Sequence, residues 1–221
     1  MSDIDLRKKR ELKRRMENIG NILEVAEKLF VKNGYRKTSM DDIAAEAQFS
    51  KATVYRYFDG KLDILIRIVK DSMNEYSDKM TSIINENISA EQKIKKIVHS
   101  ILSYFEKKKN LARVFLVERD LMKKFVSVEK GGHFFHHFKK KKVPEDLEVL
   151  FNEIFDQMCK VIKEGISSGE FRKTDPREAT FLLNSMVRGF HFQGFNERKG
   201  YSIEKNTELI SDIFINGIKR K

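Results

Sequence analysis

The sequence has little proline, glycine or cysteine. Its 221 residues include 2 Pro, 11 Gly and 1 Cys, with no long tract of Ser and Pro. Because helix breakers are scarce, we expect regular structure almost from end to end, without extensive disorder. The lone Cys159 cannot close an internal disulfide, which fits a reducing cytoplasm and gives the expected cytoplasmic location.

Long apolar runs are also missing. The opening stretch MSDIDLRKKRELKRR is charged and has no apolar core, so we expect no secretory signal. No segment approaches the roughly twenty apolar residues that span a bilayer, so we expect no membrane protein. With 40% hydrophobic and 35% charged residues, the chain has the composition of a soluble globular protein with a sizeable core.

Acidic residues are the minority among the charges. The 44 Lys and Arg outnumber the 33 Asp and Glu, giving a net charge of +11. An excess of this size attracts polyanions, with nucleic acid as the first candidate and an anionic membrane surface as the second. A basic surface can also be simply solvated, so the charge indicates a function only beside a structural motif.

Apolar residues recur at the helical spacing of three or four, and no alternating strand pattern competes with them. The predicted class is therefore all-α, with about nine or ten helices. Start signals include a capping box at Ser89–Gln92 and the pair Asp175-Pro176. The expected helices span about 12–32, 39–47, 50–57 and 61–85, begin again at Ser89, and continue over about 110–124, 144–167, 175–195 and 202–219.

The two shortest helices, at 39–47 and 50–57, have the dimensions of a helix-turn-helix motif. The apolar set that can seal them together is Ile43, Ala44, Ala47, Phe49, Val54 and Phe58. The side chains left to project from the second helix are Lys51, Thr53, Tyr55, Arg56 and Tyr57. Cations suit phosphates, while hydroxyls and phenols suit phosphates or base edges. Lys61 begins the next helix, where its charge and free backbone N–H groups can meet a phosphate.

Residues 15–62 carry a pattern longer than this motif. It comprises Ala26, Leu29-Phe30, Asn33-Gly34-Tyr35, Thr38 through Ala44, Ala47, Phe49 through Phe58, and Lys61. The pattern resembles the DNA-binding domain of the tetracycline-repressor (TetR) family of bacterial regulators. The resemblance implies two domains. Residues 1–60 would form a basic arm and a three-helix DNA-binding domain, and residues 61–221 a helical ligand-binding and dimerisation domain.

The same resemblance implies roles for single residues. Thr38 and Ser39 would contact the DNA backbone, and Lys61 would grip a phosphate. The residues implied to line the recognition helix are Lys51, Ala52, Thr53, Tyr55 and Tyr57. One position departs from the pattern, because the family usually has Gly where Gln48 stands. We therefore expect strain at a positive φ there, or a slightly different turn.

The C-terminal two thirds resembles the family only in architecture. Gly169–Pro176 resembles the junction before the last two helices, which in the family pair with their copies in a second subunit. Residues 179–195 are apolar nearly all round, which independently favours a partner over burial within one chain. Asn184, Arg188 and His191 form a polar line that either binds an effector or crosses the interface. The expected interface residues are Phe181, Asn184, Arg188, Phe192, Ile210 and Phe214.

Apolar and aromatic residues between about 61 and 195 predict a pocket for a small apolar effector such as an acyl chain or a hydrophobic drug. A packed core would have the same composition. Glu118 lies on an apolar stripe, where a carboxylate is costly unless paired. It either meets a cationic or hydroxylated ligand or sits at the stripe's edge beside a Lys or Arg. The candidate pocket residues are Phe105, Phe115, Glu118, Met122 and Phe155.

Two basic segments leave alternatives open. The arm, residues 1–15, has seven Lys and Arg against three acids, and either reaches DNA or is a solvated helical extension. His133, His136 and His137 have a usable metal spacing. However, no Cys or acid joins them and Lys139–Lys142 repel a cation, so we expect no metal.

The leading hypothesis is a homodimeric, sequence-specific transcriptional regulator, acting as a ligand-released repressor. Each subunit would place residues 50–57 in the major groove of half a palindromic operator, and a ligand would tilt the 61–85 helix. One alternative is a basic helical adaptor at an anionic surface. The least supported is a metal-dependent helical enzyme, because the chain has no nucleophile motif, paired acids or Gly-rich phosphate loop. We expect neither an enzyme nor a cofactor.

Overall fold

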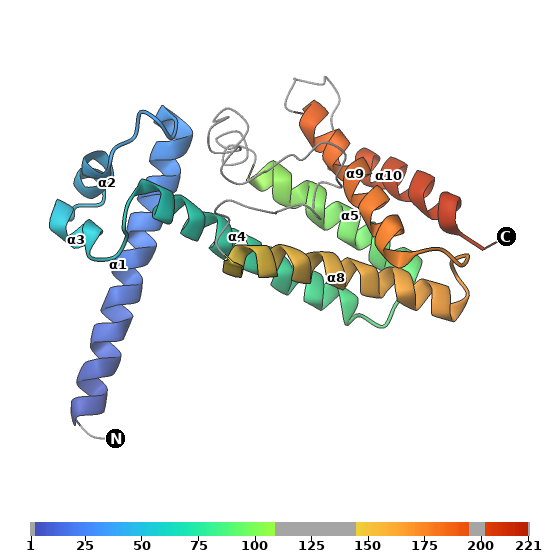
Figure 1. Cartoon of the computed structure of the whole chain (residues 1–221), viewed down its shortest axis with the longest axis horizontal. Coiled ribbons are helices and arrows are strands. Elements are labelled where there is room, and N and C mark those ends of the chain that lie inside the picture. The colour runs from blue at the N-terminus through green and yellow to red at the C-terminus, as the bar shows by residue number, and fades with distance from the viewer. Residues whose placement is uncertain (1–2, 109–144, 195–201, 221) are drawn as a thin grey trace. The chain divides into compact units, whose positions relative to one another are not determined.

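The computed structural model describes residues 3–108, 145–194 and 202–220, and eight α-helices lie in these ranges (Figure 1). The only strand-like feature there is an isolated bridge between Phe171 and Lys219, so the predicted all-α class is confirmed. The helices are α1 (Asp3–Asn33), α2 (Met40–Glu46), α3 (Lys51–Tyr55), α4 (Lys61–Ile84), α5 (Ala90–Lys107), α8 (Glu145–Ser168), α9 (Pro176–Gly194) and α10 (Ile203–Ile218).

These residues form two compact units. Unit 1 contains the described residues up to Ser72, and unit 2 contains those from Met73 onward, so α4 belongs to both. None of the described helices is long and apolar enough to cross a membrane. The helix expected at 110–124, the start expected at Pro144 and the three clustered histidines lie outside the described residues.

Short polar side chains begin the helices where the sequence predicted them. Ser39 accepts from the backbone N–H of Asp42 at 3.1 Å, and the Asp42 carboxylate accepts from the N–H of Ser39 at 2.8 Å. The capping box expected at Ser89 is confirmed, with Gln92 as its partner. Asp175 accepts from the first N–H groups of α9. Each cap satisfies N–H groups that lack an intrahelical acceptor.

The first helix begins at Asp3, and the expectation of a start near Leu12 is wrong. Residues 3–11 have no apolar stripe, but four of the nine are Lys or Arg, which form helices readily. From Asp3 onward the basic arm is therefore part of α1. The opposite error occurs in the recognition helix, which ends at Tyr55 and not at Tyr57.

A small apolar core holds unit 1 together. Ile22, Ala26 and Phe30 of α1 are fully buried. The predicted seal of α2 and α3 is confirmed for every member except Phe49, which is half-buried. Gln48 has a φ of 59°, so the positive φ expected in the turn is present without a glycine.

In unit 2, α5 packs against α8, α9 and α10. The crossing is close at Gly165, where an added Cβ would come within 2.2 Å of the Phe171 ring and 2.9 Å of Ala90 Cβ. The Glu170 carboxylate accepts from the N–H groups of Ala90 and Glu91 at the start of α5. Cys159 is buried, and burial raises the pKa of its thiol.

Candidate nucleic-acid interface

The exposed face of α3 consists of Lys51, Ala52 and Tyr55, and we call it the reading face. Tyr55 is the large aromatic here, with 46% of its surface exposed. Thr53 is half-buried, and its hydroxyl lies 2.8 Å from that of Ser50. The reading face therefore offers a cation, a methyl group and a phenol on a helix of major-groove dimensions.

Lys51 and Asp41 join the starts of α3 and α2. Their charged groups lie 2.8 Å apart, and the hydrogen bond with Asp41 raises the pKa of Lys51. Both side chains are largely exposed, so the pair contributes little to stability. In this arrangement the Lys51 ammonium group lies at the N-terminal end of the recognition helix.

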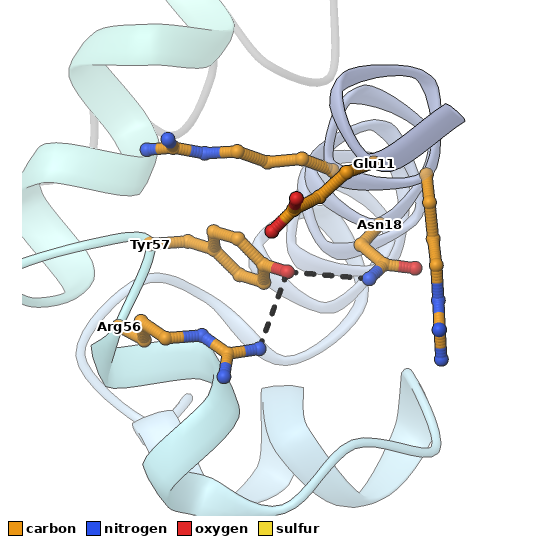
Figure 2. Close-up of a pocket in the computed structure, with 6 residues that line it drawn as sticks. Glu11, Asn18, Arg56 and Tyr57 are labelled. Atoms are coloured by element: carbon orange, nitrogen blue, oxygen red, sulfur yellow. Dashed lines mark hydrogen bonds between the residues drawn. The ribbon is translucent and has the colours of Figure 1, made fainter. Parts of the chain in front are cut away.

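Tyr57 turns towards α1. Its hydroxyl accepts from Asn18 Nδ2 at 3.2 Å and from Arg56 Nη2 at 3.4 Å (Figure 2). These two hydrogen bonds, from Asn18 first, lower the pKa of Tyr57 because they favour the phenolate. Tyr57 was predicted to project from the recognition helix, but in this structure its hydroxyl faces a helix of its own subunit.

A groove of about 550 Å³ lies around this hydroxyl. Figure 2 shows Glu11 and Asn18 approaching Tyr57 from α1 and Arg56 approaching it from the end of α3. Three guanidinium groups and one carboxylate line it, so the groove favours anions. Its lining residues are Glu11, Arg14, Arg15, Asn18, Arg56 and Tyr57.

The sequence contained the signal for this groove, but it was missed. Residues 11, 14, 15 and 18 follow the helical spacing that places side chains on one face. With α1 expected to start at Leu12, Glu11 fell outside the helix and the four residues could not be placed on one helical face. Local spacing predicts no role for Asn18, because its partner Tyr57 lies 39 residues away in the sequence.

Lys61 and Thr38 are engaged within unit 1. The Lys61 ammonium group donates to the carbonyl oxygens of Tyr35 at 2.7 Å and Thr38 at 2.8 Å, and lies 4.4 Å from the Tyr35 ring centroid. Thr38 is 1% exposed, and its hydroxyl donates to the Gly34 carbonyl at 2.9 Å. Ser39 is exposed. Of the residues implied to contact the DNA backbone, Thr38 thus offers DNA the least side-chain surface.

The predicted effector residues are only partly described. Phe105 and Phe155 are half-buried in unit 2, and the Arg177 guanidinium lies 5.0 Å from the centre of the Phe155 ring. Phe115, Glu118 and Met122 lie outside the described residues. No group of three His, Cys, Asp or Glu that could hold a metal occurs in the part of the chain that the structure describes.

The residues expected at a dimer interface divide by burial. Ile210 and Phe214 are 0% and 5% exposed within one subunit, so they belong to the core of unit 2. The large apolar residues exposed on the same two helices are Leu182, Leu209 and Ile213, at 57%, 47% and 54%.

The other expected interface residues lie on α9. Phe181, Asn184 and Arg188 are half-buried. The side chains of His191 and Phe192 are outside the part of the chain whose side chains the structure describes. Burial lowers the pKa of Arg188 to about 10.

Fold and site together define a helix-turn-helix protein of the DNA-binding class. The family model "Bacterial regulatory proteins, tetR family" matches residues 22–68, and the model "QacR-like protein, C-terminal region" matches residues 130–220. The chain belongs to the TetR family of bacterial regulatory proteins.

Full-length relatives agree with this assignment. The fatty acid metabolism regulator protein of Bacillus subtilis is 24% identical over 211 residues, covering 95% of this chain and all of the relative. The regulator QacR of Staphylococcus aureus is 24% identical over 208 residues, covering 90% and 97%. The structure of FadR from Bacillus subtilis in complex with stearoyl-CoA shares the fold, with a TM-score of 0.69, 20% identity and coverage of 90% and 98%. The protein is a DNA-binding transcriptional regulator.

Proposed function

We propose that the protein is a homodimeric repressor that binds a palindromic operator and leaves it when a small amphipathic effector binds. The observation that carries the proposal is the reading face on α3, a helix that begins at the Ser50 cap. One such face reads one half-site, so a palindrome requires two subunits.

The proposed dimer uses the exposed apolar residues of α9 and α10. Leu182, Leu209 and Ile213 are large apolar side chains in contact with solvent in the single subunit. Burying them against their copies removes apolar surface from water, which favours association. This assignment replaces the buried Ile210 and Phe214 as the proposed contacts.

The proposed effector has an acyl chain and a polar head. The names of two relatives concern fatty acid metabolism and a stearoyl-CoA complex, which supports this class of ligand. Unit 2 also holds buried polar atoms with no partner in the described residues, and two of them are the hydroxyl of Tyr76 and Oε1 of Gln157. Burial raises the pKa of Tyr76, so its phenol stays neutral and able to donate.

These polar atoms suit an amphipathic ligand because a buried polar group without a partner costs free energy. Gln157 Nε2 already donates to Ser77 at 3.3 Å and Thr81 at 3.1 Å, which fixes the amide and leaves its oxygen free to accept. A carbonyl or hydroxyl on the effector would supply the missing hydrogen bonds. Such a ligand can shift the DNA-binding equilibrium only if it prefers one conformation.

A titration by fluorescence anisotropy tests the proposal. Duplexes selected from a random pool by the protein should contain an inverted repeat and bind far more tightly than scrambled duplexes of equal length. Affinity should fall steeply with salt. Adding acyl-CoA thioesters of increasing chain length should release the operator. Binding without sequence preference, or without steep salt dependence, would contradict the proposed function.

A second candidate function is that of an adaptor at an anionic membrane surface, and one feature of α1 supports it. Leu12 and Met16 are 58% and 65% exposed on a strongly basic helix, a combination typical of helices that lie on membranes. Vesicles containing phosphatidylserine should compete poorly with operator DNA for the protein at physiological salt. If the vesicles compete well, the adaptor becomes the better assignment.

A further inference from the structure

The groove between α1 and the end of α3 is not part of the reading face, yet its charges suit an anion. Arg14 and Arg15 of α1 make no hydrogen bond or ion pair within the described residues. Both side chains are exposed. Two guanidinium groups are therefore available to a ligand on the same face of one helix.

The other side of the groove is fixed in position. Arg56 donates to the Tyr57 hydroxyl, and its guanidinium lies 5.2 Å from the Tyr57 ring centroid. Asn18 donates to the same hydroxyl from α1. These contacts hold Arg56 and Tyr57 towards α1 and join the long helix to the end of the recognition helix.

The chemistry of the groove suits an oxyanion, and a backbone phosphate is the oxyanion that duplex DNA on the neighbouring reading face would bring to it. Planar guanidinium groups form forked hydrogen bonds to phosphate oxygens, and a fixed phenol can add a further one. The single acid in the lining, Glu11, leaves the positive charge in excess. Arg56 and Tyr57 directly follow Tyr55 of the reading face, so the groove lies beside the surface that would meet base edges.

We propose that this groove is a second DNA site, which binds backbone phosphates flanking the half-site and contains Tyr57. The proposal rests on the proposed function, since it requires that the reading face bind duplex DNA. It assigns Tyr55 to sequence recognition and Tyr57 to backbone binding. It also gives the N-terminal half of α1, which precedes the family match at residue 22, a role in affinity.

Two double variants on one helix provide the test. Arg14→Ala with Arg15→Ala removes two charges from the groove. Lys9→Ala with Lys13→Ala removes two charges from exposed residues that the helical repeat places on the opposite face of α1. Alanine preserves helix propensity in both variants, and circular dichroism should confirm equal helicity. Both proteins also have the same net charge, so long-range attraction to DNA is matched.

For the groove variant we expect roughly tenfold weaker binding, equal on operator and scrambled duplexes, and a salt slope reduced by about 1–2 units, since each phosphate contact contributes about 0.9. The Lys9 and Lys13 variant should keep nearly the full slope. On duplexes truncated to the recognition site, the difference between the two variants should disappear. Tyr57→Phe should weaken binding without changing base preference, whereas Tyr55→Ala should change it.

Equal salt slopes for the two double variants would overturn the proposal. So would a Tyr57→Phe variant with altered base preference. A groove variant that loses binding to phosphatidylserine vesicles but keeps its DNA affinity would assign the groove to lipid instead. In each case the operator preference of the unaltered protein reports separately on the proposed function.

Discussion

The ammonium group of Lys61, at the start of α4, donates a hydrogen bond to the carbonyl oxygen of Thr38, 2.8 Å away, just before α2. A second bond, to Tyr35, binds the same loop to α4. The family resemblance assigns this lysine to a phosphate. In this structure it also connects the start of α4 to the loop between α1 and α2.

Lys61→Met should lower the free energy of unfolding by about 1–3 kcal/mol, because hydrogen bonds from a charged donor are lost while the stem of the side chain is kept. Chemical denaturation followed by circular dichroism measures this. Lys37→Met, which removes an exposed charge from the same loop, is the control and should leave stability unchanged. If Lys61→Met changes only the salt dependence of DNA binding, its role lies in the phosphate contact alone.

Gln48→Gly should stabilise the protein by about 0.5–1 kcal/mol. Gln48 has a φ of 59°, where a Cβ is strained and glycine is not. Gln48→Ala keeps the Cβ and serves as the matched control, with no gain expected. Urea denaturation distinguishes the two variants, and equal midpoints would show that the turn carries no such strain.

The double substitution Leu209→Glu with Ile213→Glu should separate the subunits of the proposed dimer. Placing carboxylates on the exposed apolar face of α10 should raise the dimer dissociation constant by roughly a hundredfold or more, as loss of buried apolar anchors does. Sedimentation velocity measures the change, and operator affinity should fall with it. Val149→Glu, at a residue 48% exposed on α8, is the control and should remain dimeric. Dissociation of both variants alike would exclude the α9–α10 face.

Tyr76→Phe should raise the free energy of unfolding by about 1–2 kcal/mol, since it removes a buried hydroxyl with no partner in the described residues. The same change should weaken the response to acyl thioesters if that hydroxyl binds the effector's head. Tyr104→Phe is the control, because Tyr104 is half-buried and makes other interactions. A stabilised Tyr76→Phe variant with an unchanged effector response would remove Tyr76 from the proposed ligand site.

The sequence by itself determined the helix-turn-helix motif and most of the helix starts, although not the start of α1 or the end of α3. Spacing of three and four located the buried stripes, and the caps at Ser39, Ser89 and Asp175 are formed as predicted. These signals are local, because a cap or a helical stripe depends on residues within one or two turns. The positive φ at Gln48 is one of the two alternatives that the family resemblance offered for this position.

Tertiary structure decided which polar groups remain available for function. Sequence spacing could not show that the Thr38 hydroxyl and the Lys61 ammonium group bond within unit 1, or that Tyr57 faces Asn18 across 39 residues. Ile210 was expected at the dimer interface. In the structure it is fully buried on α10, which packs against α5. Side-chain burial and hydrogen bonding depend on elements distant in sequence. Only the packed chain therefore separates a core contact from a binding surface.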